Sequence, residues 1–178
     1  EWRDDFGHLS GPNSLAVDAQ GRVYIADMYN SRVQVFDASG AYLATIGGSW
    51  GVRNGELRDP TGVAVDKQGN VYIADLTNHR IQKFAPGVPG WRQANISGFG
   101  DRNNNAAFAL EAFNGHLYAG VRNWAEGATM WRTGDGTTWT RVSEPAFGNP
   151  LEGANRAVLD MIVFKNQLYA TTGWFYDD

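Results

Sequence analysis

Short apolar runs separated by turn-forming residues dominate the first part of the chain. Each run has the length of a β-strand and is rich in β-branched and aromatic residues, which favour strands over helices. The runs are Leu15–Val17, Val23–Ile25, Val33–Val35 and Tyr42–Thr45. Asp, Asn and Gly, which form tight turns, stand between them. The pattern predicts four antiparallel strands in about 40 to 50 residues.

The same pattern returns 48 residues later. Residues 13–36 and 61–84 agree at 14 of 24 positions, with no gap in the alignment. A period of this size is typical of arrays in which each unit buries its hydrophobic face against a neighbour. Four-stranded antiparallel units at this period predict an all-β fold, a β-propeller built of blades.

A second kind of repeat follows the first. Residues 104–121 align with 155–172 at an offset of 51, and residues 91–100 align with 139–148 at an offset of 48. We therefore expect about three and a half blades, the last ending after its second strand. Their expected bounds are 11–47, 60–97, 105–145 and 156–178.

The incomplete last blade predicts self-association. Closed propellers have about 4 to 8 blades, and an unpaired strand edge is a template for another chain. We expect the half blade to meet a second copy. In this interpretation residues 1–10 are a leader or closing segment.

Two stretches resemble known propeller families. Leu15–Phe36 and Val63–Phe84, which read LAVDAQGRVYIADMYNSRVQVF and VAVDKQGNVYIADLTNHRIQKF, resemble the NHL repeat. This resemblance implies that the first strand of each blade lines a central channel. The segment Thr133–Trp139 resembles a shortened Asp box of sialidase-like (BNR) propellers, which implies that Asp135 caps a hairpin turn and that Trp139 packs between strands.

These resemblances indicate a hybrid or partial propeller. NHL-like sequence covers residues 11–84, and Asp-box-like sequence covers residues 85–178, beginning with the outer strand of blade two. The change falls in the Pro- and Gly-rich segment Ala85–Gly90, where an exchange is best tolerated. Natural and engineered recombination both remain open.

Composition excludes several functional classes. The chain has 178 residues, a net charge of −4 and no cysteine, so neither disulfides nor thiolate metal sites are expected. Basic residues alternate with acidic ones, which argues against a nucleic-acid partner. No apolar run approaches the roughly 18 residues of a membrane span, so no membrane partner is expected. The compartment is open, with an extracellular or periplasmic one favoured.

The most prominent polar residues are interpreted as structural. They recur in each NHL-like blade, whereas a reaction centre is needed only once. They are Asp27, Asn30 and Arg32, with their copies Asp75, Asn78 and Arg80, and we add Asp135 and Trp139 of the Asp-box-like turn. The three histidines share no spacing, and a catalytic zinc needs about three protein ligands. We therefore expect no catalytic residue, metal or cofactor.

Ligand binding is predicted on one face of the propeller. The loops from the second to the third strand, and from the outer strand to the next blade, lie together on that face. Its candidate residues are Trp50, Arg53, Asp101, Arg102, Arg122, Asn123, Trp124 and Trp174. Aromatic rings beside amides suit a glycan or a peptide. The alternative is that these tryptophans cap the core or an oligomer contact.

The leading hypothesis is a non-enzymatic scaffold or binding module that self-associates to complete a ring. A second hypothesis is a fragment of a propeller hydrolase or lyase whose catalytic residues lie in other blades. It predicts a metal or an acidic cluster in the channel. A third is a recombined propeller without a selected function.

Overall fold

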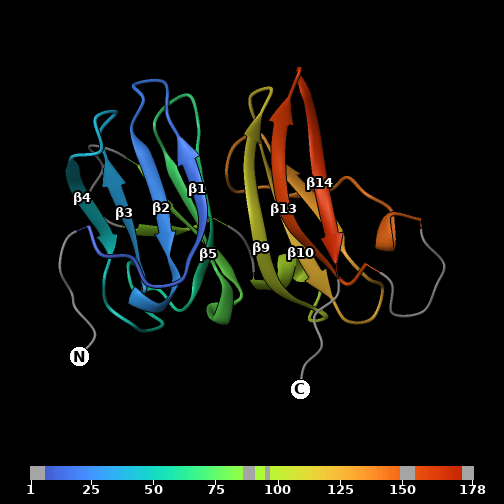
Figure 1. The fold of residues 1–178 in the computed structure, drawn as a ribbon. Helices are drawn as coiled ribbons and strands as arrows, with labels where there is room; N and C mark the ends of the chain where they lie inside the picture. Colours follow the sequence, from blue (N-terminus) through green and yellow to red (C-terminus); the bar gives the residue numbers. More distant parts are fainter. Residues whose placement is uncertain (1–6, 86–90, 95–96, 149–154, 174–178) are drawn as a thin grey trace.

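The computed structural model describes residues 7–85, 91–94, 97–148 and 155–173. It consists of three four-stranded antiparallel sheets and one two-stranded sheet, each a blade (Figure 1). This confirms the predicted all-β fold of about three and a half blades. Blade one contains β1 (Pro12–Val17), β2 (Val23–Asp27), β3 (Arg32–Phe36) and β4 (Tyr42–Gly47). Blade two contains β5 (Pro60–Val65), β6 (Val71–Asp75), β7 (Arg80–Phe84) and β8 (Trp91–Gln93).

Blades three and four carry the second repeat. Blade three contains β9 (Asn104–Phe113), β10 (His116–Asn123), β11 (Thr129–Thr133) and β12 (Thr140–Arg141). Blade four contains β13 (Ala157–Phe164) and β14 (Gln167–Gly173). Short 3₁₀ turns join some strands: η1 (Met28–Asn30), η2 (Leu76–Asn78), η3 (Ser97–Gly100) and η4 (Pro145–Gly148).

The blades form an open arc in chain order. The innermost strands β1, β5, β9 and β13 lie side by side in the middle of the view, and β4 lies at its outer edge (Figure 1). β1 packs on β5, β5 on β9, and β9 on β13. Within the described part of the chain, β13 and β1 do not pack on each other as consecutive blades do. Blades one and four are therefore the two ends of the arc.

Three hydrophobic layers hold consecutive blades together. They follow from strand alternation, because successive side chains point to opposite faces of a sheet. Between blades one and two lie Tyr24, Ala26, Val33, Val35, Ile46, Leu57, Val63, Val71 and Ile73. Between blades two and three lie Ala64, Tyr72, Ala74, Ile81, Ala94, Ala107, Leu110, Leu117, Ala119 and Val121. Between blades three and four lie Ala109, Ala128, Val158 and Met161.

Two glycines allow the inner strands to come close. A Cβ atom on Gly62 of β5 would lie 2.7 Å from the carbonyl oxygen of Phe108 in β9. A Cβ atom on Gly120 of β10 would lie 2.5 Å from Cβ of Val158 in β13. Both distances are shorter than a van der Waals contact, so a larger side chain at either position would push the blades apart.

The second repeat keeps its backbone shape as well as its spacing. In η3, Gly98 and Phe99 have φ values of 63° and 54°. In η4, 48 residues later, Ala146 and Phe147 have φ values of 47° and 55°. The two segments aligned in the sequence therefore form the same left-handed turn before the inner strand of the next blade.

Candidate functional site

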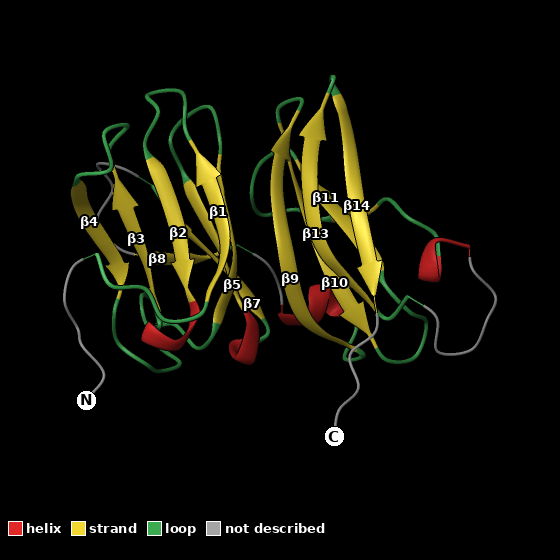
Figure 2. Cartoon of the chain, viewed as in Figure 1, coloured by secondary structure: helices red, strands yellow, loops and turns green. Residues whose placement is uncertain are grey.

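One end of the blades collects the loops predicted to bind ligands. The loops β2–β3 and β6–β7 contain η1 and η2, which close the lower end of blades one and two (Figure 2). The loop β4–β5 reaches the same end. We call this end the loop face. Its residues divide into buried hydrogen-bond networks and exposed aromatic side chains.

In blade two, a buried network centres on Asp75. The Asp75 carboxylate accepts hydrogen bonds from the backbone N–H of Arg58 at 2.7 Å, from Asn78 Nδ2 at 2.9 Å and from Arg80 Nε at 2.7 Å. Arg80 then donates to the carbonyl oxygens of Val52, Arg53 and Glu56 at 2.7–2.9 Å. Since the guanidinium is paired and its donors are occupied, the burial of both charges is compensated. The network fastens the β4–β5 loop to blade two.

Blade one repeats this network. Asp27 accepts from the backbone N–H of Ser10 at 2.6 Å, from Asn30 Nδ2 at 2.9 Å and from Arg32 Nε at 2.8 Å. Arg32 Nη2 donates to the carbonyl oxygen of His8 at 2.7 Å. Burial alone would raise the pKa of Asp27, but the hydrogen bonds from Ser10, Asn30 and Arg32 hold this pKa below its usual range.

The networks include a buried glutamine that the sequence interpretation did not single out. Gln34 accepts from the backbone N–H of Gly7 at 3.0 Å and donates to Asp27 Oδ2 at 3.3 Å. Gln82 accepts from Gly55 at 2.9 Å and donates to Asp75 Oδ2 at 3.0 Å. Both glutamines are fully buried. The sequence did carry a signal for them, because the same residue, glutamine, stands at both positions 48 residues apart.

The N-terminal segment also belongs to the repeat. Residues 7–12 read GHLSGP and residues 55–60 read GELRDP, again at an offset of 48. Gly7, His8 and Ser10 make the contacts with blade one that Gly55, Glu56 and Arg58 make with blade two. Residues 7–10, which lie in the segment expected to be a leader or closing segment, therefore make the same contacts with blade one that the β4–β5 loop makes with blade two. The three shared residues Gly, Leu and Pro are the signal that could have shown this.

In blade three, Asn123 occupies the end of the second strand. Its side chain donates to Asp101 Oδ2 at 3.0 Å and to Asn104 Oδ1 at 2.8 Å, and it accepts from the backbone N–H groups of Ala125 and Glu126 at 2.9 and 2.8 Å. Asn123 is buried and its amide is fully engaged. It therefore shapes the turn and has no group left for a ligand, although the sequence placed it among the ligand-binding candidates.

Trp124 lies within cation–π distance of two guanidinium groups at the loop face. The Cζ atom of Arg122 is 4.7 Å from its ring centroid, and that of Arg156 is 5.2 Å away. Arg122 Nε also donates to Asn105 Oδ1 at 2.9 Å. Arg156, which was not among the predicted ligand-binding residues, thus joins two that were, Arg122 and Trp124. We call Arg122, Trp124 and Arg156 the Trp124 cluster.

The remaining candidates lie elsewhere on the loop face. Trp50 is exposed and stacks under Arg58, whose Cζ atom is 3.7 Å from the ring centroid. The backbone N–H of Arg53 donates to Glu56 Oε2 at 2.9 Å. Arg102 is exposed in the loop before β9. Trp174 lies outside the described residues.

The Asp-box-like turn lies at the opposite end of blade three. Asp135 Oδ1 accepts from the backbone N–H groups of Thr137 and Thr138, both at 2.7 Å, and from the hydroxyl of Thr133 at 2.8 Å. These donors, the Thr138 N–H first, hold the pKa of Asp135 well below its usual range. Trp139 Nε1 donates to the carbonyl oxygen of Ala94 at 2.7 Å, which links blade three to blade two.

Two carboxyl groups border the central channel. Glu111 of β9 and Asp160 of β13 line a cavity of about 490 Å³, together with residues of β1 such as Ser14. Burial, and then the negative charge of Asp160, raise the pKa of Glu111 to about 7. Within the described ranges, no group of three or more His, Cys, Asp or Glu residues could hold a metal ion. The part of the chain that is described also has no helix long and apolar enough to span a bilayer.

Comparison with known proteins places the fold among β-propellers. The NHL repeat family matches residues 9–36 and 57–84, the two blades with the Asp–Asn–Arg pattern. Blades one and two therefore carry NHL repeats. No curated protein matches the chain. The resemblance of blades three and four to sialidase-like propellers remains a prediction.

Solved structures extend the likeness to the whole arc. The crystal structure of a nidogen/laminin complex matches with 16% identity and a TM-score of 0.65, over 92% of this chain and 72% of the other. A catalytically inactive virginiamycin B lyase from Staphylococcus aureus with quinupristin matches with 10% identity and a TM-score of 0.63. That match covers 96% of this chain but 50% of the lyase, so the chain spans half the lyase's length. These identities show the fold alone.

Proposed function

We propose that the chain is a non-enzymatic binding module whose arc of blades is completed by a second copy of itself. The observation that carries the proposal is the unequal burial of one repeated position. Leu15 and Val63 occupy the same place in β1 and β5, yet Leu15 is 64% exposed and Val63 is 1% exposed. Val63 packs against blade one. Among the described residues, no blade covers Leu15.

The exposed position belongs to an apolar surface. Leu15 pairs with Ile25 and Val17 pairs with Val23, so the four side chains share the side of blade one that points away from blade two. We call them the incoming face. Their copies at positions 71 and 73 in blade two, Val71 and Ile73, are buried. Leu15 and Val17 are exposed, and Val23 and Ile25 are partly buried. Exposed apolar side chains grouped in this way mark an interaction site.

The other end of the arc carries a second apolar surface. Ile162, Phe164 and Tyr169 of blade four are 62%, 57% and 47% exposed. Val158 and Met161 of the same blade pack toward blade three, so strand alternation points Ile162 and Phe164 to the free side. Tyr169 pairs with Ile162. We call these three residues the outgoing face.

A second copy supplies both missing neighbours. Inside the chain, each blade lays its outgoing side on the incoming side of the next, so a head-to-tail contact between two chains repeats a geometry that the chain already uses. Such a contact closes a ring when the rotations add up to a full turn. The likeness to the lyase supports this, because the chain follows half of that propeller with a TM-score of 0.63.

The loop face provides the surface for a ligand. The Trp124 cluster and the stacked pair Trp50 and Arg58 are aromatic and cationic, which suits a glycan or a peptide. The nidogen/laminin structure is a protein–protein complex on a similar fold. It supports a binding role for a propeller of this kind.

Solution mass tests the proposal. Sedimentation equilibrium of the full chain is expected to give twice the chain mass of 19.5 kDa. Leu15→Lys is expected to give one chain mass, because a charge on the incoming face cannot be desolvated there. Val52→Lys, at an exposed apolar residue of the β4–β5 loop, is the matched control and should behave as the wild type. Even a weak specific association has a Kd of about 1 μM. A wild-type chain that is still monomeric at a concentration of roughly tens of micromolar would therefore contradict the proposal.

A catalytic fragment is the second candidate, because the channel holds the carboxyl pair Glu111 and Asp160. A carboxyl with a pKa of about 7 is suited to general acid–base chemistry. Quinupristin, present in the lyase structure, is the first compound to test. Turnover that is lost in Glu111→Gln would favour this candidate over the binding module. If the wild type and Glu111→Gln both leave quinupristin at its uncatalysed rate of breakdown, the catalytic candidate is rejected for this compound.

A further inference from the structure

We propose that the cleft between blades two and three, at the end opposite the loop face, binds a small carboxylate with an apolar side chain. An apolar amino acid or the C-terminal residue of a peptide has this chemistry. The proposal is independent of self-association, because blades two and three lie inside the arc. It rests on the shape of the cleft and on two polar side chains, Lys67 and His116.

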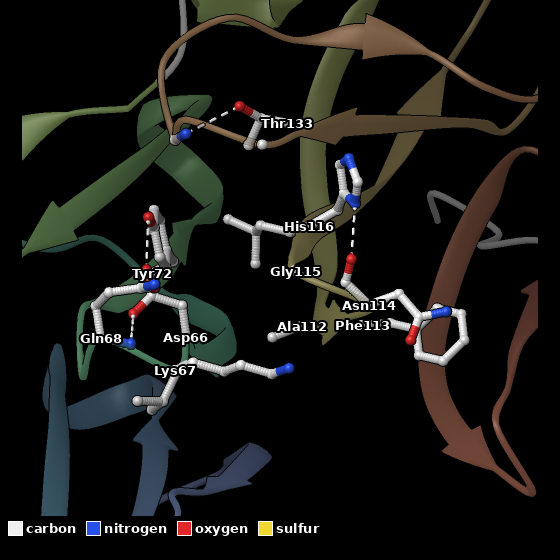
Figure 3. A pocket seen from close by; sticks show the side chains of 14 residues that line it. Asp66, Lys67, Gln68, Tyr72, Ala112, Phe113, Asn114, Gly115, His116 and Thr133 are labelled. Carbon is white, nitrogen blue, oxygen red and sulfur yellow. Dashed lines mark hydrogen bonds between the residues drawn. The ribbon is translucent and has the colours of Figure 1, made fainter.

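The cleft forms where the two repeat types meet. The β5–β6 turn of blade two has five residues, 66–70, whereas the β9–β10 turn of blade three has two, Asn114 and Gly115. The longer turn faces the shorter one across a pocket of about 190 Å³ (Figure 3). At roughly 30 Å³ per water, this space holds about six waters, which suits a ligand of amino-acid size.

The floor of the cleft is apolar. Val65, Ala112 and Leu117 line it from both blades. Water over such a surface is displaced favourably by an aliphatic or aromatic group, at about 25 cal/mol per Å² of apolar area. The floor therefore selects a ligand with an apolar side chain.

Lys67 provides the positive charge. Its side chain extends from the blade-two turn toward the blade-three side of the cleft (Figure 3). Within the described residues, no carboxylate forms a salt bridge with it. An ammonium beside an apolar floor recognises a carboxylate through charge-assisted hydrogen bonds.

The nearby Asp66 does not compete for Lys67 by contact. Asp66 Oδ1 accepts from the backbone N–H groups of Gln68 and Asn70, both at 2.9 Å. Asp66 Oδ2 accepts from Asn70 Nδ2 at 2.6 Å and from the hydroxyl of Tyr72 at 3.1 Å. Asp135 is likewise engaged by Thr133, Thr137 and Thr138. Both acids are thus used to build the two turns.

His116 provides a hydrogen-bond acceptor on the far wall. Its Nδ1 lies 3.0 Å from the carbonyl oxygen of Asn114, and a carbonyl only accepts, so the proton sits on Nδ1. In the neutral imidazole, Nε2 then carries a lone pair. It lies beside Gly134, where an added Cβ would be 3.7 Å from it. A ligand in the cleft can donate an N–H to Nε2.

NMR titration of the full-length, ¹⁵N-labelled chain tests the proposal. N-acetyl-leucine is expected to bind saturably, with shifts in the amides of residues 65–68, 112–117 and 133–136. N-acetyl-leucinamide, which lacks only the negative charge, should bind at least tenfold more weakly. Free leucine and a short peptide that ends in leucine show whether the cleft takes an amino acid or the C-terminus of a peptide. Binding of either one supports the proposal.

Variants taken from the repeat keep the test independent of folding. Lys67→Ala turns the sequence DKQG of blade two into the DAQG of blade one, so the turn is known to form with it. It should weaken N-acetyl-leucine at least tenfold. Gly134→Val, at a position with room for a Cβ, should fill the cleft and abolish binding. Lys165→Asn is the control, because it removes one charge at the corresponding turn of blade four and Asn tolerates its φ of 48°.

Three results would overturn the proposal. One is equal affinity for the acid and the amide, which would mean that the charge is not recognised. Another is unchanged binding of N-acetyl-leucine by Lys67→Ala, or a loss of binding in Lys165→Asn as large as in Lys67→Ala. The third is the absence of saturable chemical-shift changes in residues 65–68, 112–117 and 133–136. Changes confined to the loop face around Trp124 count as this third result.

Discussion

Blades one and two have the same strands, the same buried Asp–Asn–Arg network and 14 of 24 aligned residues in common, yet they differ in burial on one side. In both, a tyrosine hydroxyl donates to the carboxylate of the first turn at 3.1 Å, Tyr24 to Asp18 and Tyr72 to Asp66. On the incoming side, however, Val63 is buried and Leu15 is exposed. The local structure of a blade thus follows from its own sequence. Its burial follows from the neighbour that covers it.

The difference has an energetic meaning. Full burial of a Leu or Val side chain contributes about 1.5–3 kcal/mol relative to exposure. Val63 of blade two gains this burial free energy by packing on blade one. Leu15 and Val17 lack most of it in the isolated chain, because they are exposed. Equivalent substitutions should therefore have unequal effects on the incoming sides of the two blades and equal effects on their opposite sides.

The largest expected effect is the contrast between Val63→Lys and Leu15→Lys. Val63→Lys places an ammonium in a closed apolar layer and should lower the free energy of unfolding by about 4 kcal/mol. Leu15→Lys should change it by less than about 0.5 kcal/mol in a dilute monomer, because the position is exposed. Urea denaturation measures both. Equal losses in the two variants would contradict the assignment of Leu15 to an open face.

The next effect concerns the buried aspartates. Asp75→Ala should cost about 3–5 kcal/mol, because it leaves the guanidinium of Arg80 buried without its counter-charge. Asp27→Ala should cost about 1 kcal/mol less, because among the described residues Arg32 donates to one backbone carbonyl and Arg80 donates to three. Thermal unfolding, with the Asn variants as conservative controls, measures the difference. A larger cost at Asp27 would contradict this ranking.

A smaller effect comes from Glu111 in the channel beside the open β1. Its folded pKa of about 7 lies above the ordinary value of 4.5, so the folded state keeps a proton that the unfolded state loses between these pH values. Stability should therefore fall as the pH rises from 4.5 to 7. Glu111→Gln should remove this fall and gain about 1–2 kcal/mol at pH 8, with no gain at pH 4. Parallel stability curves for the two proteins would show that Glu111 titrates normally.

The smallest expected difference is on the covered sides of the blades. Tyr24→Phe and Tyr72→Phe each remove one hydroxyl from a buried hydrogen bond and should each cost about 1 kcal/mol. The two values should agree within about 0.5 kcal/mol. Chemical denaturation of both variants supplies the internal control. Unequal costs here would mean that the blades differ beyond the incoming face.

Periodicity in the sequence predicted the blade architecture well. The 48-residue offset and the alternation of apolar positions located the strands of blades one and two to within a few residues. The offset of 51 likewise located the inner strands of blades three and four. These features succeed because strand, turn and repeat are all local patterns. The predicted start of blade one at residue 11 left out part of the repeat, since Gly7 and Leu9 match Gly55 and Leu57.

The candidate sites depend on contacts between blades, which the sequence does not display. Arg156 joins Trp124 only because blade four packs on blade three. Asn123 looked available as a polar loop residue, but it is buried by the turn that it caps. The cleft near Lys67 arises from unequal turn lengths in adjacent blades. Each feature requires the relative placement of segments far apart in the chain.

Site-specific cross-linking tests the central claim most directly, because the chain has no cysteine of its own. Between blades three and four, Val158 contacts Gly120. In the repeat, Leu15 of the incoming side corresponds to Val158, and Thr171 of the outgoing side corresponds to Gly120. A mixture of Leu15→Cys and Thr171→Cys chains, treated with a short bis-maleimide, should yield a covalent pair, and neither variant alone should do so. The absence of this pair in the mixture, or its formation by either variant alone, would contradict a head-to-tail ring of two copies.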